Sequence, residues 1–219
     1  MLEFRAVEKA FRLPGGGRRR ILSGLTLDLP QKYRVAIIGR NGAGKSTFLR
    51  MVAGTLQPDH GEIRRLGRIS WPMGFSGGFH PALTGRQNAR FVARIYGADT
   101  DDLVEEVQAF CDLGPYFDAR LQTYSSGMRA RLALGVSLAT NFDCYLVDEI
   151  TAVGDAAFRK KAQRTFAERL DRVQVIMVSH SEATLREYCN SALFLQDGEG
   201  WFFEDLEEGL AAYRKSIAS

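Results

Sequence analysis

Residues 39–46 carry a phosphate-binding pattern, because Gly39-Arg-Asn-Gly-Ala-Gly-Lys45-Ser46 fits the spacing G-x-x-x-x-G-K-[ST]. Glycines let a backbone curl so that its N–H groups face phosphate oxygens, and a helix that starts there adds a positive dipole end. In this geometry Lys45 reaches the β- and γ-phosphates, while the hydroxyl of Ser46 binds Mg²⁺. The pattern predicts ATP and Mg²⁺ as ligands. The remaining nucleotide-binding candidates of this loop are Gly39, Asn41, Gly42, Ala43, Gly44 and Thr47.

Polar residues follow two apolar runs farther along the chain. Asp148 and Glu149 come directly after residues 144–147, and His180 comes after residues 175–179. Paired with a phosphate loop, Asp148 is expected to bind Mg²⁺ and Glu149 to deprotonate the attacking water. A lone histidine is most often structural, but at the end of such a strand His180 is placed to hydrogen-bond a γ-phosphate.

A second anion site is predicted at Ser125, Ser126 and Gly127, which precede the helical pattern of residues 129–140. Small residues at a helix start leave backbone N–H groups free for a phosphate. Because one chain folds around one nucleotide at Lys45, the second site is expected to serve the ATP of another copy. The sequence therefore predicts an ATP-sandwiched dimer.

The elements that must position these residues follow from the apolar pattern. Residues 33–54 read as a buried strand, a loop and a helix, and residues 144–179 read as strand, helix and strand, which predicts parallel pairing. Between them residues 80–140 are expected to be helical, with Thr84 capping one helix and Thr100 or Asp101 capping the next.

Composition excludes several classes of protein. The 219 residues are 45 % hydrophobic and 25 % charged, which is typical of a globular chain. A net charge of +3 is too small to indicate nucleic acid as a partner, and the basic glycine turn at residues 15–20 reads as a solvated hairpin tip. The 3 cysteines indicate buried, reduced thiols and a cytosolic compartment. No apolar run reaches the ~18 residues of a membrane span.

Taken in order, these motifs resemble the ATP-binding cassette of ABC transporters over nearly the whole chain. The signature of that family, Leu-Ser-Gly-Gly-Gln, stands here as Tyr124-Ser-Ser-Gly-Met128. Within the family, residues 38–46, 70–75 and 148–155 look like the ATPases that export capsular polysaccharide. The resemblance implies an α/β fold, namely a P-loop NTPase cassette with a mainly parallel core sheet, an N-terminal antiparallel β subdomain and an inserted helical subdomain at about 80–140 within one domain, 1–219.

The resemblance also implies roles for two further residues. Asp155 matches the loop aspartate of the dimer seam, and Phe11 stands where an aromatic ring stacks on adenine, although a core aromatic at a strand end is the alternative for Phe11. One departure concerns metal binding: the family normally has a Gln before the helical subdomain, and residues 69–79 contain none. Another group or a water must complete the Mg²⁺ shell.

For function, the resemblance implies an ATP-hydrolysing subunit that lies on the cytoplasmic face of the inner membrane, bound to a membrane-spanning subunit that makes the main contacts to the polysaccharide. A GTPase or small-molecule kinase is disfavoured because no Asn-Lys-x-Asp guanine motif is present. The alternatives are a soluble ABC ATPase acting on nucleic acid or ribosomes, and export of another cargo such as O-antigen or teichoic acid.

Two aromatic residues, Trp71 and Phe75, stand in a glycine-rich stretch without helical or strand periodicity. Aromatic anchors in a loop are common at interfaces, so we expect them to dock the membrane subunit. The alternative is that they fill the space between subdomains.

Overall fold

The computed structural model describes residues 2–73, 78–148, 155–170 and 172–218. The chain divides into two compact units, and each is described by itself. The first unit comprises Met1–Pro72, Phe142–Glu149 and Leu170–Ser219, and the second comprises Met73–Asn141 and Ile150–Arg169.

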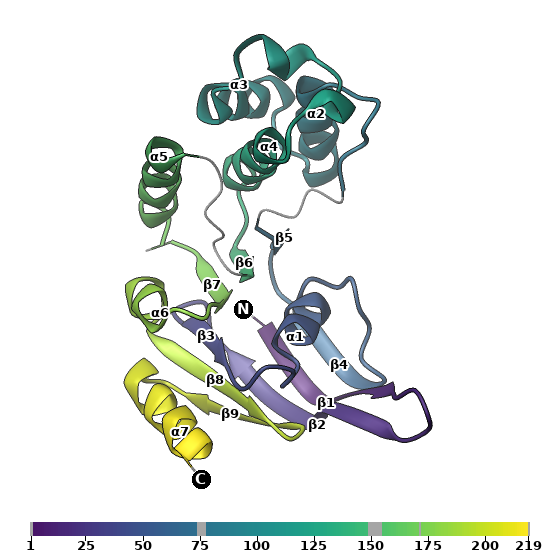
Figure 1. The fold of residues 1–219 in the computed structure, drawn as a ribbon, viewed down its shortest axis with the longest axis vertical. Helices are drawn as coiled ribbons and strands as arrows, with labels where there is room; N and C mark the ends of the chain where they lie inside the picture. The colour runs from purple at the N-terminus through teal and green to yellow at the C-terminus, as the bar shows by residue number, and fades with distance from the viewer. Residues whose placement is uncertain (1, 74–77, 149–154, 171, 219) are drawn as a thin grey trace. The chain divides into compact units, whose positions relative to one another are not determined.

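A six-stranded sheet forms the centre of the first unit (Figure 1). Every neighbouring pair of its strands is parallel except the last, which is antiparallel. Strands covered on both faces read as continuous apolar runs, and all residues of β7 are buried. The prediction of a mainly parallel sheet is confirmed. In spatial order the strands are β5 (Ile69–Pro72), β6 (Cys144–Asp148), β7 (Gln174–Val178), β3 (Arg34–Ile38), β8 (Ser191–Gln196) and β9 (Glu199–Phe203).

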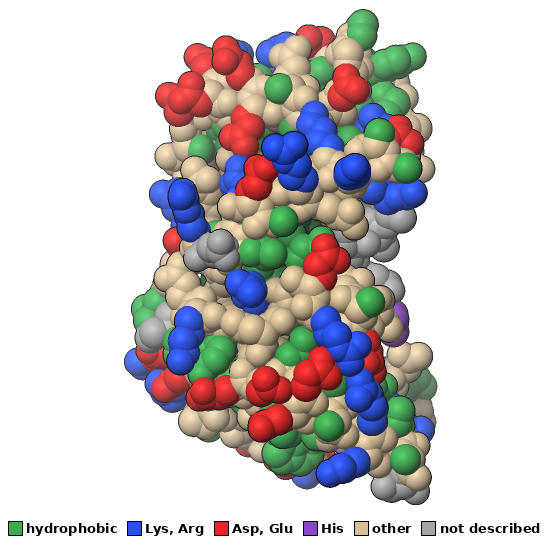
Figure 2. All heavy atoms as spheres, turned by 90° about the vertical axis from the view of Figure 1, so that its left-hand side faces the viewer, with side chains coloured by type: hydrophobic (Ala, Val, Ile, Leu, Met, Phe, Trp, Pro, Cys, Tyr) green, Lys and Arg blue, Asp and Glu red, His purple; other side chains and the backbone are tan. Residues whose placement is uncertain are grey.

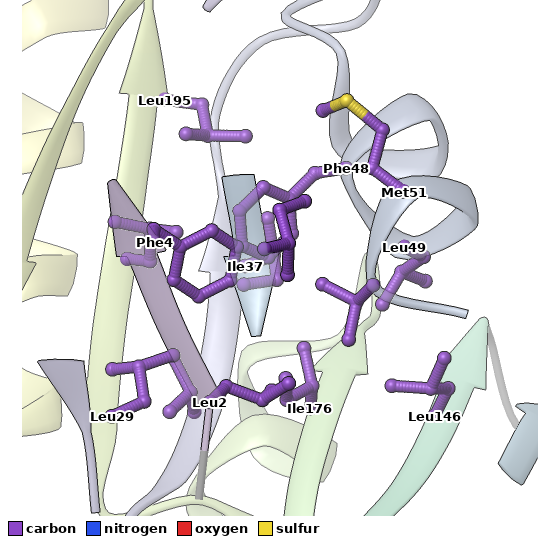
Figure 3. Packing of buried hydrophobic residues seen from close by; sticks show 14 of the residues in the cluster. Leu2, Phe4, Leu29, Ile37, Phe48, Leu49, Met51, Leu146, Ile176 and Leu195 are labelled. Carbon is purple, nitrogen blue, oxygen red and sulfur yellow. The ribbon is translucent and has the colours of Figure 1, made fainter. Parts of the chain in front are cut away.

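A three-stranded antiparallel sheet belongs to the same unit, with β1 (Leu2–Arg12) between β2 (Arg18–Leu29) and β4 (His60–Arg65). Its inner side chains and those of the larger sheet share one core with the apolar side of α1 (Lys45–Val52) (Figure 3). The rings of Phe4 and Phe48 stack there with centroids 5.3 Å apart. This core fixes the helix that follows the phosphate loop.

Two helices complete the first unit. The α6 helix (Glu182–Tyr188) packs on β7, and α7 (Leu206–Ala218) packs along β8 and β9 (Figure 1). Arg186 joins them, because its guanidinium lies 2.9 Å from Glu182 and 2.6 Å from Glu207. The chain segment that follows β7 is therefore tied to the last helix by surface ion pairs.

The second unit is helical where the structure describes it. Its α-helices are α2 (Gly85–Tyr96), α3 (Thr100–Cys111), α4 (Ser126–Ala139) and α5 (Ala156–Ala167), with short 3-10 turns at Gly114–Asp118 and Leu121–Thr123. The helices expected within residues 80–140 are thus confirmed, whereas their assignment as a subdomain of one domain stays a prediction.

The predicted helix caps have mixed outcomes. Thr84 caps α2 as expected and forms a capping box with Gln87. The cap expected for α3 at Thr100 or Asp101 is wrong, because the carboxylate of Asp99 accepts from the N–H groups of Asp101 and Asp102. Asp is as good a cap as Thr, and Asp99 stands one residue earlier.

Basic and acidic side chains are interspersed on the face that Figure 2 displays. Among the described helices, none has the length and apolar character needed to cross a membrane.

Candidate functional site

The phosphate loop connects β3 to α1 in a conformation that its glycines permit. Gly39 has φ +151°, and a Cβ there would overlap the carbonyl oxygen of Leu195. Gly44 caps α1 with φ +103°, a left-handed backbone conformation that is unfavourable for residues other than glycine. Helix α1 then begins at Lys45, so its free N–H groups face the loop. The strand, loop and helix predicted from the pattern are confirmed.

The ammonium group of Lys45 is held inside this loop. Its Nζ donates to the carbonyl oxygens of Gly39, at 2.7 Å, and Arg40, at 3.1 Å. Partial burial lowers the pKa of Lys45 from its ordinary value, and the nearby carboxylate of Asp148 opposes that shift. The ammonium group of Lys45 is therefore already partly desolvated before an anion binds in the loop.

A cavity of about 540 Å³ lies over the loop, entirely within the first unit. Most of the predicted nucleotide- and metal-binding residues line it, although they come from distant parts of the chain. The predicted residues on its wall are Phe11, Asn41, Gly42, Gly44, Lys45, Ser46, Thr47, Asp148 and His180. Gly39 and Ala43 belong to the loop backbone without lining the cavity.

Asp148 and His180 reach the cavity from two neighbouring strands. Asp148 is the last residue of β6, and His180 follows the end of β7 by two residues. Because β6 and β7 are parallel and in register, with Asp148 opposite Val178, both side chains arrive at the same sheet edge. This edge is where open α/β sheets bind ligands.

Phe11 is exposed at 40 % of its surface and lines the cavity, so it is not a core aromatic. Its ring is therefore accessible to a flat ligand group. Glu149, the predicted base, lies outside the described residues.

The remaining predicted site residues belong to the second unit. Ser125 caps α4, its hydroxyl accepting from the N–H of Met128 at 3.2 Å, while Ser126 and Gly127 open the helix. Asp155 caps α5 and pairs with Arg131 at 2.7 Å. The hydrogen bond from the backbone of Phe158 is the largest cause that lowers the pKa of Asp155, so its carboxylate is ionised at neutral pH.

Of the charged residues that line the cavity, the sequence analysis missed Arg19. Residues 15–17 do form a turn, but Arg19 lies in β2, where its side chain lines the cavity and donates to the carbonyl oxygen of Gly42. The prediction of a solvated hairpin tip is wrong for Arg19. Strand alternation places Arg19 on the opposite face from Arg18 and Arg20, but which face borders the cavity depends on the pairing of β2 with β1.

Trp71 is part-buried in β5 and packs edge-on against Phe142, with ring centroids 5.3 Å apart. Both residues belong to the first unit, so this contact favours neither docking nor filling of the space between subdomains. Phe75 lies outside the described residues, so docking of the membrane subunit by this pair stays a prediction.

Comparisons with known proteins agree with this site. The family model for ABC transporters matches residues 22–152. The chain is 48 % identical to the polysialic acid transport ATP-binding protein KpsT of Escherichia coli, over 99 % of this chain and 100 % of that protein. It is 42 % identical to the capsule polysaccharide export ATP-binding protein CtrD of Neisseria meningitidis serogroup B, over 97 % and 98 % of the two chains.

The fold is similar to that of a dimeric ATP-binding cassette solved in a post-hydrolysis state with ADP and Pi, with a TM-score of 0.76 and 21 % identity over 94 % of this chain and 99 % of that one. The predicted cassette fold and the resemblance to capsule-export ATPases are thereby confirmed. The chain belongs to the ABC transporter family.

Proposed function

We propose that this protein is the ATP-hydrolysing subunit that powers an exporter of capsule-type polysaccharide. The observation that carries the proposal is the single cavity wall shared by Lys45, Ser46, Asp148 and His180. These residues combine a phosphate cradle with the acidic and hydrogen-bonding groups that phosphoryl transfer to water requires. The relatives named for polysialic acid and capsule export supply the cargo class.

Two residues of the cavity suit Mg²⁺. The hydroxyl of Ser46 and the carboxylate of Asp148 are hard oxygen donors on the same wall, and Mg²⁺ is usually held by one or two protein oxygens together with phosphates and waters. The described residues include no group of three or more His, Cys, Asp or Glu that could hold a metal ion. A Mg²⁺ ion that keeps several waters does not need such a group. When bound, Mg²⁺ neutralises charge on the β- and γ-phosphates.

Three side chains of the protein have separate roles in ATP hydrolysis. Lys45 exchanges the carbonyl oxygens of Gly39 and Arg40 for phosphate oxygens, which offsets its partial desolvation. His180 donates to the γ-phosphate from the end of β7. Glu149, which directly follows Asp148, takes the proton of the attacking water.

A second copy of the chain is part of the proposal. Ser125, Ser126 and Gly127 would contact the γ-phosphate of the ATP bound by the partner copy, and Asp155 would line the dimer seam. The solved cassette with a similar fold is dimeric. A membrane-spanning subunit would hold the pair on the cytoplasmic face of the inner membrane and make the main contacts to the polysaccharide, with no nucleic acid involved.

The test of hydrolysis uses two variants with opposite expected defects. Lys45→Ala should lose ATP affinity, whereas Glu149→Gln should bind ATP, stop hydrolysing it and accumulate as a dimer, because an amide keeps the shape of the base but accepts no proton. Lys160→Ala removes a charge from the exposed side of α5 and serves as the control. Hydrolysis by Glu149→Gln at the parental rate would refute the assigned base.

The composite site is tested by mixing chains. Ser126→Arg and Lys45→Ala homodimers should both be inactive, while their heterodimer should keep at most one intact site. Full activity of Ser126→Arg alone would refute contact with the partner's nucleotide.

The cargo is tested in cells. Purification of the tagged chain from membranes should recover a membrane-spanning subunit, and Lys45→Ala should abolish surface polysaccharide. Recovery of RNA or ribosomes instead would favour the nucleic-acid alternative.

A further inference from the structure

Arg19 faces the base-binding side of the cavity. In the antiparallel register of β1 and β2, Arg19 lies directly opposite Phe11. Residues opposite each other in such a pair project to the same face, with Cβ atoms about 4.5–5.5 Å apart. The side chains of Phe11 and Arg19 therefore leave neighbouring positions of the two strands, and both line the cavity.

The same guanidinium also touches the phosphate loop. Its Nη2 atom donates to the carbonyl oxygen of Gly42, and a Cβ at Gly42 would collide with it. Arg19 thus spans the distance between the ring of Phe11 and the middle of the loop. Any ligand that stacks on Phe11 and places phosphates in the loop must pass this group.

Charge on the cavity wall favours an anion beside Arg19. Arg19 and Lys45 are cationic, and Asp148 is the one carboxylate among the described lining residues. Within the described part of the chain, Arg19 forms no ion pair, and its guanidinium has only the carbonyl of Gly42 as a partner. A neutral carbonyl satisfies one of its five N–H donors.

We propose that Arg19 is a nucleotide-contacting residue that binds the α-phosphate of ATP. The inference rests on the proposed function, because it requires the cavity to hold a nucleotide. With the base on Phe11 and the β- and γ-phosphates at Lys45, the ribose and the α-phosphate lie between them, beside Arg19. The guanidinium then donates to an α-phosphate oxygen, a stronger acceptor than the carbonyl of Gly42.

The test compares ligands that differ only in their phosphates. Equilibrium dissociation constants of the full chain and its Arg19→Gln variant are measured for ATP, ADP, AMP and adenosine. Arg19→Gln should weaken ATP, ADP and AMP by a similar factor, about tenfold to a hundredfold, because all three carry the α-phosphate. Adenosine, which lacks it, should change by less than about twofold.

Arg18→Gln is the matched control. It removes the same charge from the neighbouring position of β2, whose side chain lines a different cavity together with Arg20 and Asp59. Its affinities should equal those of the parent. Thermal unfolding without nucleotide should be the same for Arg18→Gln and Arg19→Gln, which separates phosphate contact from support of the loop.

The outcomes are distinguishable. Parental affinity of Arg19→Gln for all three nucleotides would overturn the assignment of Arg19 and leave the proposed function intact. A loss confined to ATP would place the guanidinium at the γ-phosphate and also overturn it, as would an equal loss for adenosine. Failure of the parent chain to bind ATP would refute the proposed function itself.

Discussion

Gly44→Ala should destabilise the first unit more than a Gly→Ala change at another glycine with a left-handed backbone, because two energetic costs combine at this position. Gly44 has φ +103°, and its added Cβ would overlap the Cγ2 atom of Ile21. The backbone cost of a left-handed alanine is about 1–2 kcal/mol, and forcing an extra methyl group into packed surroundings costs about 1–3 kcal/mol. We therefore expect the free energy of unfolding to fall by about 2–5 kcal/mol.

The matched control stands at the other end of the same helix. Gly54 follows α1 with φ +77°, but the nearest atom to an added Cβ is Cζ of Arg65 at 3.7 Å, an ordinary contact. Gly54→Ala should thus cost only the backbone strain, about 1–2 kcal/mol. A larger loss for Gly44→Ala isolates the overlap with Ile21.

Urea unfolding followed by tryptophan fluorescence measures both costs. The chain has 2 tryptophans, Trp71 and Trp201, and both lie in the first unit with the two glycines. In an Ile21→Ala background the overlapping atom is gone, so Gly44→Ala should cost about 1–3 kcal/mol less than in the parent. Equal costs for Gly44→Ala and Gly54→Ala, or equal costs of Gly44→Ala in both backgrounds, would refute this reasoning.

Three further outcomes are expected. Thr84→Ala removes the side-chain cap of α2 and should lower the free energy of unfolding by about 1 kcal/mol in urea, while Thr84→Ser should keep most of it. The hydrogen bonds from Lys9 and from the backbone of Ala10 lower the pKa of Asp59. The stabilisation by its carboxylate is therefore present above the pKa of an unfolded Asp and is lost progressively as the pH falls from there through the lowered pKa of the folded state. In urea unfolding, Asp59→Asn should lose less stability than the parent between pH 6 and pH 3, and a loss equal to the parent's would contradict this linkage. Burial raises the pKa of each of the 3 thiols to about 12, so a thiol reagent at about pH 8 should modify none in the native chain and all of them in urea; the thiols are Cys111, Cys144 and Cys189.

The phosphate loop and the parallel core could be predicted from the sequence because their signals are local. Lys45 and Ser46 stand in a short pattern whose glycines permit the backbone conformation of the phosphate loop. The apolar run of β3 predicts that this strand is buried. Asp148 and His180 follow two such runs, and parallel pairing alone brings them to one edge. Each of these inferences needed no knowledge of side-chain packing.

Arg19 could not be placed because its role depends on register between two strands. The turn at residues 15–17 hides how far β2 extends, and only the pairing of Phe11 with Arg19 shows that the middle arginine faces the cavity. The cap of α3 failed for another reason: Asp99, Thr100 and Asp101 are all competent N-caps, and the one chosen depends on where the backbone turns. Long-range register and near-equivalent local choices are both invisible to sequence patterns.

The position of β7 between β6 and β3 has a consequence for how the chain is made. Strand β3 pairs with β7 and β8, so both partners of the strand that carries the phosphate loop are translated only after residue 173. At about 5–20 residues per second, β3 waits roughly 8–30 s on the ribosome before β8 follows it. Until then its apolar residues have no sheet to join and are a target for chaperones, and a chain terminated before β7 never assembles the loop. Nucleotide binding thus reports that translation has passed β8.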